Sequence, residues 1–263
     1  MKRFLVFVGL FACASFGLLS SHDYTASTLQ CIPEVIWAPA TGGGTWVTSL
    51  QITGRSATTS LNAYFMYGGG NYRYLASWAV NLDPGESYYF PNILSTLDAY
   101  DLEAFTYYGR VGALLISGNS GTIQITARTT NGNYGKTMQG LSWDACYKFG
   151  SGNAAVFNVA NSATYRTFVG FMNWSASPIT VRFYVTTGNY TYVGSYFDRV
   201  FAGWDFQAFN PFDQAGVSYP AYSYPDNMLI WMSVVSGTGQ LVGFGSSANN
   251  YTNDSAAHLL VQW

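Results

Sequence analysis

Apolar and polar residues alternate along most of this chain, in short runs separated by glycine, proline and asparagine. Alternation places every second side chain on the same face, so these runs predict half-buried β-strands. The breaks, among them Gly68-Gly69-Gly70 and Asp83-Pro84-Gly85, provide the positive φ that tight reversals require. Only residues 94–105 could hold a short helical turn. The pattern therefore predicts an all-β fold, of sandwich or barrel type.

The predicted strands form two series of eight. The first series covers residues 34–38, 45–53, 60–67, 72–80, 87–90, 111–117, 122–129 and 136–143. The second covers residues 155–159, 167–173, 179–185, 191–200, 205–209, 229–235, 240–247 and 257–263. Each series is long enough to bury a core of its own.

The two series look like copies of one unit. Ser117 to Asn131 returns as Ser236 to Asn250, 119 residues later, and this shift places Ile123 on Val242 and Ile125 on Phe244. Apolar parity is kept across most of the shift, as expected when the pleat fixes which face is buried. We therefore predict two tandem β-sandwich domains over residues 31–146 and 153–263, joined by a small polar hinge.

The first twenty residues have the composition of an export signal. Lys2 and Arg3 precede an apolar run over residues 4–19, which a polar stretch follows. This pattern predicts a signal peptide over residues 1–20 and a secreted, periplasmic or cell-surface protein. The alternative is an uncleaved anchor, in which case the leader alone would contact the membrane.

The predicted export would place the remaining cysteines in an oxidising compartment. Beyond the leader only Cys31 and Cys146 are present, one at each end of the first predicted domain. In an oxidising compartment they predict a single disulfide, which would stabilise the domain by about 4–5 kcal/mol in the chain-entropy model. The alternative is a pair of buried thiols.

Composition narrows the function classes. Charged residues make up 9% of the chain, aromatic residues 18%, and the net charge is −2, which disfavours a nucleic-acid partner. The chain has two histidines, His22 beside the leader and His258 in the last predicted strand, so a nucleophilic triad is disfavoured. We predict no catalytic residues, no cofactor and no enzymatic activity.

One acidic group and one aromatic group are candidate sites. Asp98, Asp101 and Glu103 gather in one loop, where they are weak calcium candidates or a solvated loop, and we predict no metal site. The aromatic candidates are Tyr64, Tyr67, Tyr72, Tyr74 and Trp78 in the first series, and Tyr190 and Tyr192, flanked by Tyr184 and Tyr196, in the second. Exposed rings could bind sugars or another protein, whereas cross-strand packing within the sheet would bury them.

The run from Arg166 to Asn173, the Ser175-Ala-Ser-Pro178 turn and the alternating Ile179 to Tyr184 resemble repeats of secreted bacterial proteins. The segment Ser246 to Asp254 is similar to a late motif of those repeats, whereas Thr129 to Tyr134 departs from it. The resemblance implies tandem immunoglobulin-like β-sandwiches that serve as non-catalytic surface, adhesive or spacer modules.

These observations predict a secreted or cell-surface, non-catalytic structural or adhesive binding module, with a glycan or another surface protein as partner. One alternative is an outer-membrane β-barrel, because Trp263, with Val261, Leu259 and Ala257 in alternation before it, resembles the closing strand of such barrels. The other is a carbohydrate-binding or carbohydrate-active jelly-roll protein.

Overall fold

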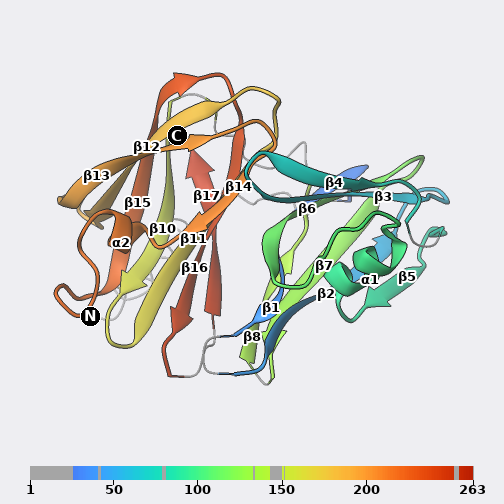
Figure 1. Ribbon diagram of the computed structural model, residues 1–263, viewed down its shortest axis with the longest axis horizontal. Coiled ribbons are helices and arrows are strands. Elements are labelled where there is room, and N and C mark those ends of the chain that lie inside the picture. Colours follow the sequence, from blue (N-terminus) through green and yellow to red (C-terminus); the bar gives the residue numbers. More distant parts are fainter. Residues whose placement is uncertain are drawn as a thin grey trace, which may run out of the picture.

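The computed structural model describes residues 26–40, 43–78, 81–132, 134–142, 150, 152–251 and 255–262. These residues form antiparallel sheets with two short helices, so the all-β prediction is confirmed. In Figure 1 the two sheets lie side by side as an N-terminal lobe, blue to green, and a C-terminal lobe, yellow to red. Within the described residues the longer helix has eight residues, and no helix is long and apolar enough to cross a bilayer.

The N-terminal lobe folds one sheet into two layers. Its elements are β1 (Leu29–Pro39), β2 (Thr45–Gly54), β3 (Leu61–Gly68), β4 (Asn71–Leu75), β5 (Ser87–Phe90), α1 (Ile93–Tyr100), β6 (Arg110–Gly118), β7 (Ile123–Asn131), β8 (Tyr134–Gln139) and β9 (Leu141–Ser142). The strand order is β4-β3-β6-β1-β2-β7-β8, with β5 on β2 and β9 on β1. β1 and β2 pair only from Trp37↔Val47 to Pro39↔Thr45. Over the rest of their length β1 pairs with β6 and β2 pairs with β7. The two layers thus share one short hairpin.

The C-terminal lobe has a related pairing scheme, in which β17, and not a hairpin of its first two strands, links the two halves of the sheet. Its elements are β10 (Asn153–Asn161), β11 (Tyr165–Asn173), β12 (Ile179–Thr187), β13 (Tyr192–Phe201), β14 (Phe206–Phe209), α2 (Pro211–Gln214), β15 (Tyr224–Gly237), β16 (Leu241–Asn249) and β17 (Ser255–Gln262). The strand order is β13-β12-β15-β10-β17-β16-β11-β14. β17 pairs with both β10 and β16, as β9 and β8 together pair with β1 and β7.

Every predicted strand overlaps an observed one, and α1 lies in the one stretch that was a candidate for helix. The sequence analysis missed α2. Its start is encoded locally, because the Asn210 side chain accepts a hydrogen bond from Phe212 N at 3.0 Å and Pro211 occupies the first turn.

The uniform shift of 119 residues is wrong in β16. Ile123 and Ile125 face the N-terminal core, whereas Val242 and Phe244 point away from the C-terminal core. Leu241, 118 residues after Ile123, faces the C-terminal core instead. A slip of one residue reverses the face of every side chain, so Ile123 corresponds to Leu241 and not to Val242.

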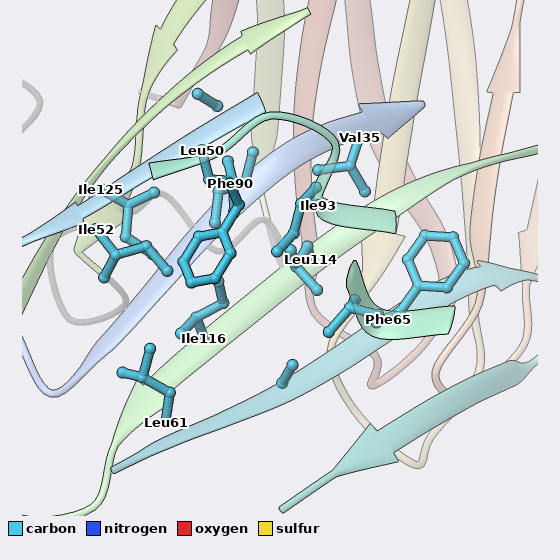
Figure 2. Packing of buried hydrophobic residues seen from close by; sticks show 14 of the residues in the cluster. Val35, Leu50, Ile52, Leu61, Phe65, Phe90, Ile93, Leu114, Ile116 and Ile125 are labelled. Carbon is cyan, nitrogen blue, oxygen red and sulfur yellow. The ribbon is translucent and has the colours of Figure 1, made fainter. Parts of the chain in front are cut away.

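Each lobe has its own apolar core. In the N-terminal lobe, side chains from both layers and from α1 converge around Phe90, Leu50, Ile52 and Leu114 (Figure 2). In the C-terminal lobe, aromatic rings fill the space: Phe183 lies 5.3 Å from both Phe171 and Phe209, measured between ring centroids. A Cβ at Gly243 would collide with the Phe171 ring, so the absence of a side chain at this position of β16 leaves room for Phe171.

A third apolar cluster joins the lobes. It contains Cys31, Met66, Ala113, Leu115 and Leu141 from the N-terminal lobe and Met172, Phe206, Val242 and Phe244 from the C-terminal lobe. The β3–β4 hairpin reaches toward β14 (Figure 1), and Gly70 N at its tip donates to Asp205 Oδ1 at 3.2 Å. The outer face of β3 and β6 therefore packs on the outer face of β11, β14 and β16.

Candidate aromatic binding surface

The structure divides the predicted aromatic candidates into three groups. Trp78 and Tyr67 belong to packing: Trp78 is 1% exposed with its ring 5.2 Å from Phe90, and Tyr67 stacks on Phe65 at 5.7 Å. The Trp78 ring is therefore not available to a ligand, and the Tyr67 ring is partly buried against the N-terminal core. The prediction that Trp78 belongs to an exposed surface is therefore wrong, because its indole lies in the N-terminal core.

Tyr64, Tyr72 and Tyr74 lie along the contact between the lobes. Tyr64 stacks on Tyr74 at 4.6 Å and meets Trp174 of the C-terminal lobe edge to face at 5.6 Å. Tyr72 lies 5.8 Å from Trp204, also of the C-terminal lobe. Burial raises the pKa of Tyr64, and the neighbouring Tyr74 adds to this. These rings serve mainly to dock one lobe on the other.

Tyr190 and Tyr192 are exposed, and three further rings join them. We define the aromatic face as Tyr184, Tyr190, Tyr192, Tyr196 and Trp231, carried by β12, β13, β15 and the turn before β13. Tyr184 lies 5.1 Å from Tyr192 and 5.9 Å from Tyr196, and Tyr190 lies 5.9 Å from Trp231. Tyr190, Tyr192 and Tyr196 are each more than half exposed. The face thus presents a row of rings to solvent.

A hollow of about 320 Å³ opens within the aromatic face, lined by Thr186, Tyr190, Tyr192 and Trp231. Thr186 is wholly buried, and its Oγ1 has no hydrogen-bond partner among the residues that the structure describes. A buried hydroxyl without a partner costs free energy, and a ligand hydroxyl could supply the missing bond. Tyr190 holds a left-handed φ of 59°, a strained conformation for an aromatic residue and one often found at ligand sites.

One ion pair borders the aromatic face. Arg182 lies over the Tyr196 ring at 4.2 Å and donates to both carboxylate oxygens of Asp198, at 2.8 and 2.9 Å. The Arg182 guanidinium lowers the pKa of Asp198, and Asp198 in turn raises the pKa of Arg182. Both groups stay charged near neutral pH, so the rim offers hydrogen-bond donors and acceptors beside the rings.

The acidic loop has a structural partner. Asp101 accepts from Arg73 Nε at 2.9 Å, from Arg73 Nη2 at 2.7 Å and from the Tyr107 hydroxyl at 3.0 Å. Arg73 Nη1 also donates to Glu103 at 2.7 Å, and Asp98 accepts from Tyr107 N at 3.2 Å. The Arg73 hydrogen bonds lower the pKa of Asp101, while burial and Asp101 raise the pKa of Tyr107.

These contacts orient the carboxylates of the acidic loop toward Arg73 and Tyr107. Among the described residues no group of three or more His, Cys, Asp or Glu side chains is arranged to hold a metal ion. The weak calcium candidates therefore have a role in fixing the loop after α1.

Several predictions concern residues outside the described ones. The signal peptide over residues 1–20 and Cys146 both lie there. Cys31 is wholly buried in the cluster between the lobes, and its backbone pairs with Leu141 of β9, five residues before Cys146. The disulfide stays a prediction.

The sequence analysis missed three tryptophans that shape these surfaces: Trp174, Trp204 and Trp231. Trp231 carried a usable signal. Its neighbours Ile230 and Met232 face the core, so alternation along β15 turns Trp231 outward, next to Tyr184 of β12. Trp174 and Trp204 follow strands, where no periodicity indicates the direction of a side chain.

Comparison with known proteins does not assign this chain to a family. No protein-family model matches the chain, and no curated protein matches it. One solved structure, of infectious bursal disease virus Gx strain, has 10% identity over 90% of this chain and 62% of that chain, with a TM-score of 0.17. This chain thus spans less than two thirds of that one, and a similarity at this level supports no argument about fold or function.

Proposed function

We propose that this protein is a secreted or cell-surface, non-catalytic binding module that holds glycans on the aromatic face of its C-terminal lobe. Two tandem immunoglobulin-like β-sandwiches form its framework. The related strand pairing of the two lobes and the residues that resemble bacterial surface repeats support this framework. The leader-like first twenty residues support export.

The exposed row of rings carries the proposal. Sugar rings have apolar faces edged by hydroxyl groups, so they suit flat aromatic side chains beside hydrogen-bonding groups. Tyr192 and Trp231 supply the rings, and Thr186 and the Arg182–Asp198 pair supply the polar groups. In the N-terminal lobe, by contrast, Tyr64 and Tyr72 contact tryptophans of the other lobe, and Tyr72 and Tyr74 are less exposed than Tyr190, Tyr192 and Tyr196.

Retention on insoluble polysaccharides, followed by a glycan array, tests this function. The full chain should be retained, and Trp231→Ala and Tyr192→Ala should each weaken binding about tenfold, because truncating a central aromatic contact commonly costs more than 1 kcal/mol. Tyr89→Ala is the matched control: Tyr89 is 66% exposed on β5 of the other lobe.

Two results would contradict the proposal. One is the absence of retention on every polysaccharide and every array glycan. The other is an equal effect of Tyr89→Ala and Trp231→Ala, which would place the binding elsewhere. Turnover of any retained glycan would contradict the non-catalytic assignment but not the assignment of glycan binding.

A further inference from the structure

The hollow in the aromatic face is walled by rings. Strands β13 and β15 flank β12, so Tyr192 and Trp231 bound the hollow on its two sides. Tyr190 adds a third ring from the turn between β12 and β13. Its plane is nearly perpendicular to the indole of Trp231, at 83°, with the ring centroids 5.9 Å apart. Tyr190 therefore forms a wall beside Trp231 and does not extend a flat platform.

The hollow is also bounded in the direction of the strands. The β12–β13 turn lies at one end, where Tyr190 N donates to Thr187 O at 2.9 Å. At the other end lies Tyr184, which is two residues before Thr186 and shares its face of β12. The Tyr184 ring lies 5.1 Å from that of Tyr192. The hollow thus opens away from the sheet and is not a groove that runs along it.

Thr186 forms the floor of the hollow. It is wholly buried, and its Oγ1 has no hydrogen-bond partner among the described residues. A hydroxyl group both donates and accepts, as a sugar hydroxyl does, so the two can bond in either direction. The neighbouring Tyr190 and Tyr192 are 55% and 63% exposed. Exposed side chains change rotamer on the nanosecond scale, so these rings can turn aside to let a ligand reach the floor.

The described residues that line the hollow carry no charge. The Arg182–Asp198 pair begins four residues before Thr186, about 13 Å away along β12, and its two charges compensate each other. A carboxylate or sulfate group placed in the hollow would lose its water without gaining a cationic partner, which costs free energy. The lining therefore favours an uncharged ligand.

We propose that the hollow binds one uncharged sugar unit at the end of a glycan chain, and that Thr186 holds a hydroxyl group of this unit. The inference rests on the proposed function and narrows it to the recognition of chain ends. A hollow with walls on every side admits a terminal unit, whereas an internal unit would need a groove open at both ends for its two neighbours. The next unit of the chain would leave the hollow on its solvent side.

Pairs of array glycans that differ only by one further sugar on the terminal unit test this inference on the full chain. The shorter member should bind, and the capped member should bind about tenfold more weakly or not at all, because the added sugar would collide with the walls. Equal binding of both members of every pair would overturn the inference and leave the proposed function intact. Binding to no glycan would contradict the proposed function, and the inference with it.

Thr186→Val tests the floor, because it keeps the shape of the side chain and removes the hydroxyl group. It should weaken binding of the strongest array glycan about fivefold, the scale of one hydrogen bond. It should not lower the unfolding midpoint, since the hydroxyl that it removes is buried without a partner. Thr180→Val, on the same face of β12 but outside the hollow, should bind that glycan as the unchanged chain does. Unchanged affinity in Thr186→Val, or an equal loss in Thr180→Val, would overturn the role of Thr186.

Discussion

Asn173, at the end of β11, is wholly buried and organises the turn that follows it. Its Nδ2 donates to the carbonyls of Ser177 at 2.9 Å and Ala202 at 2.8 Å, and its Oδ1 accepts from Gln240 N at 3.2 Å. One side chain thus satisfies backbone groups from three segments of the C-terminal lobe.

We expect Asn173→Ala to lower the free energy of unfolding by about 3 kcal/mol, because these backbone groups would remain buried without partners. Chemical denaturation followed by fluorescence measures this change. Asn189→Ala, at an exposed turn position, should stay within about 0.5 kcal/mol of the unchanged chain. Similar losses in both variants would mean that the buried network contributes little.

The Arg73–Asp101 pair allows a second prediction at this scale. Arg73→Gln should destabilise the chain by about 2 kcal/mol, because Asp101, whose side chain is 5% exposed, would lose its cationic partner. Arg182→Gln is the matched control in the other lobe, where both partners are more exposed, and should have the smaller effect.

The pH dependence of the same pair has a definite sign. Asp101 has a lowered pKa in the folded chain, so its contribution is fully present above the unfolded pKa of about 4 and is lost as pH falls through the folded pKa. The stability difference between the unchanged chain and Arg73→Gln should therefore shrink below about pH 4. A difference that stays constant from pH 7 to strongly acidic conditions would contradict this assignment.

At the scale of elements, alternation and turn residues were enough to place the strands, because burial of one face per strand is a local property of the sequence. Alternation and turn residues did not show whether the face of a strand that points away from its own core contacts solvent or the other lobe. Val242 and Phe244 look like core residues in sequence, yet they face the N-terminal lobe. For the same reason the sequence did not separate docked from exposed tyrosines, since this depends on the position of the other lobe.

The β3–β4 turn provides a prediction about this docking. Gly70 has a φ of 72°, and a Cβ there would lie 3.1 Å from Gly203 O of the other lobe, whereas Gly85 has a φ of 85° and open space around it. Gly85→Ala should cost about 1 kcal/mol for the left-handed conformation, and Gly70→Ala about 2–3 kcal/mol because the docked backbone must also move. Equal unfolding midpoints for the two variants would show that the turn does not bear on docking.

At the scale of the whole molecule, a buried ion pair lies beneath the contact between the lobes. The side chains of Lys136 and Glu34 are 5% and 8% exposed, and Lys136 reaches Ser246 of the C-terminal lobe. Such a pair commonly contributes little relative to apolar residues, but removing one partner leaves a buried charge.

Lys136→Met alone should therefore destabilise the chain by about 3–5 kcal/mol, and the double variant Lys136→Met/Glu34→Leu should be the more stable of the two. A double-mutant cycle, completed with Glu34→Leu and measured by chemical denaturation, checks this order. Losses that add without coupling would show that the two charges act independently.

The contact between the lobes joins two different surfaces, and contacts of that kind can in principle continue from one molecule to the next into a filament. The lobe-binding surface of the C-terminal lobe carries Met172, Phe206, Val242 and Phe244. The equivalent positions of the N-terminal lobe are Thr53, Ser87, Gln124 and Thr126. These polar side chains bond within their own sheet, as Thr53 does with Ser87 at 2.7 Å. At these positions the N-terminal lobe therefore lacks the apolar side chains that a second copy of this contact would need.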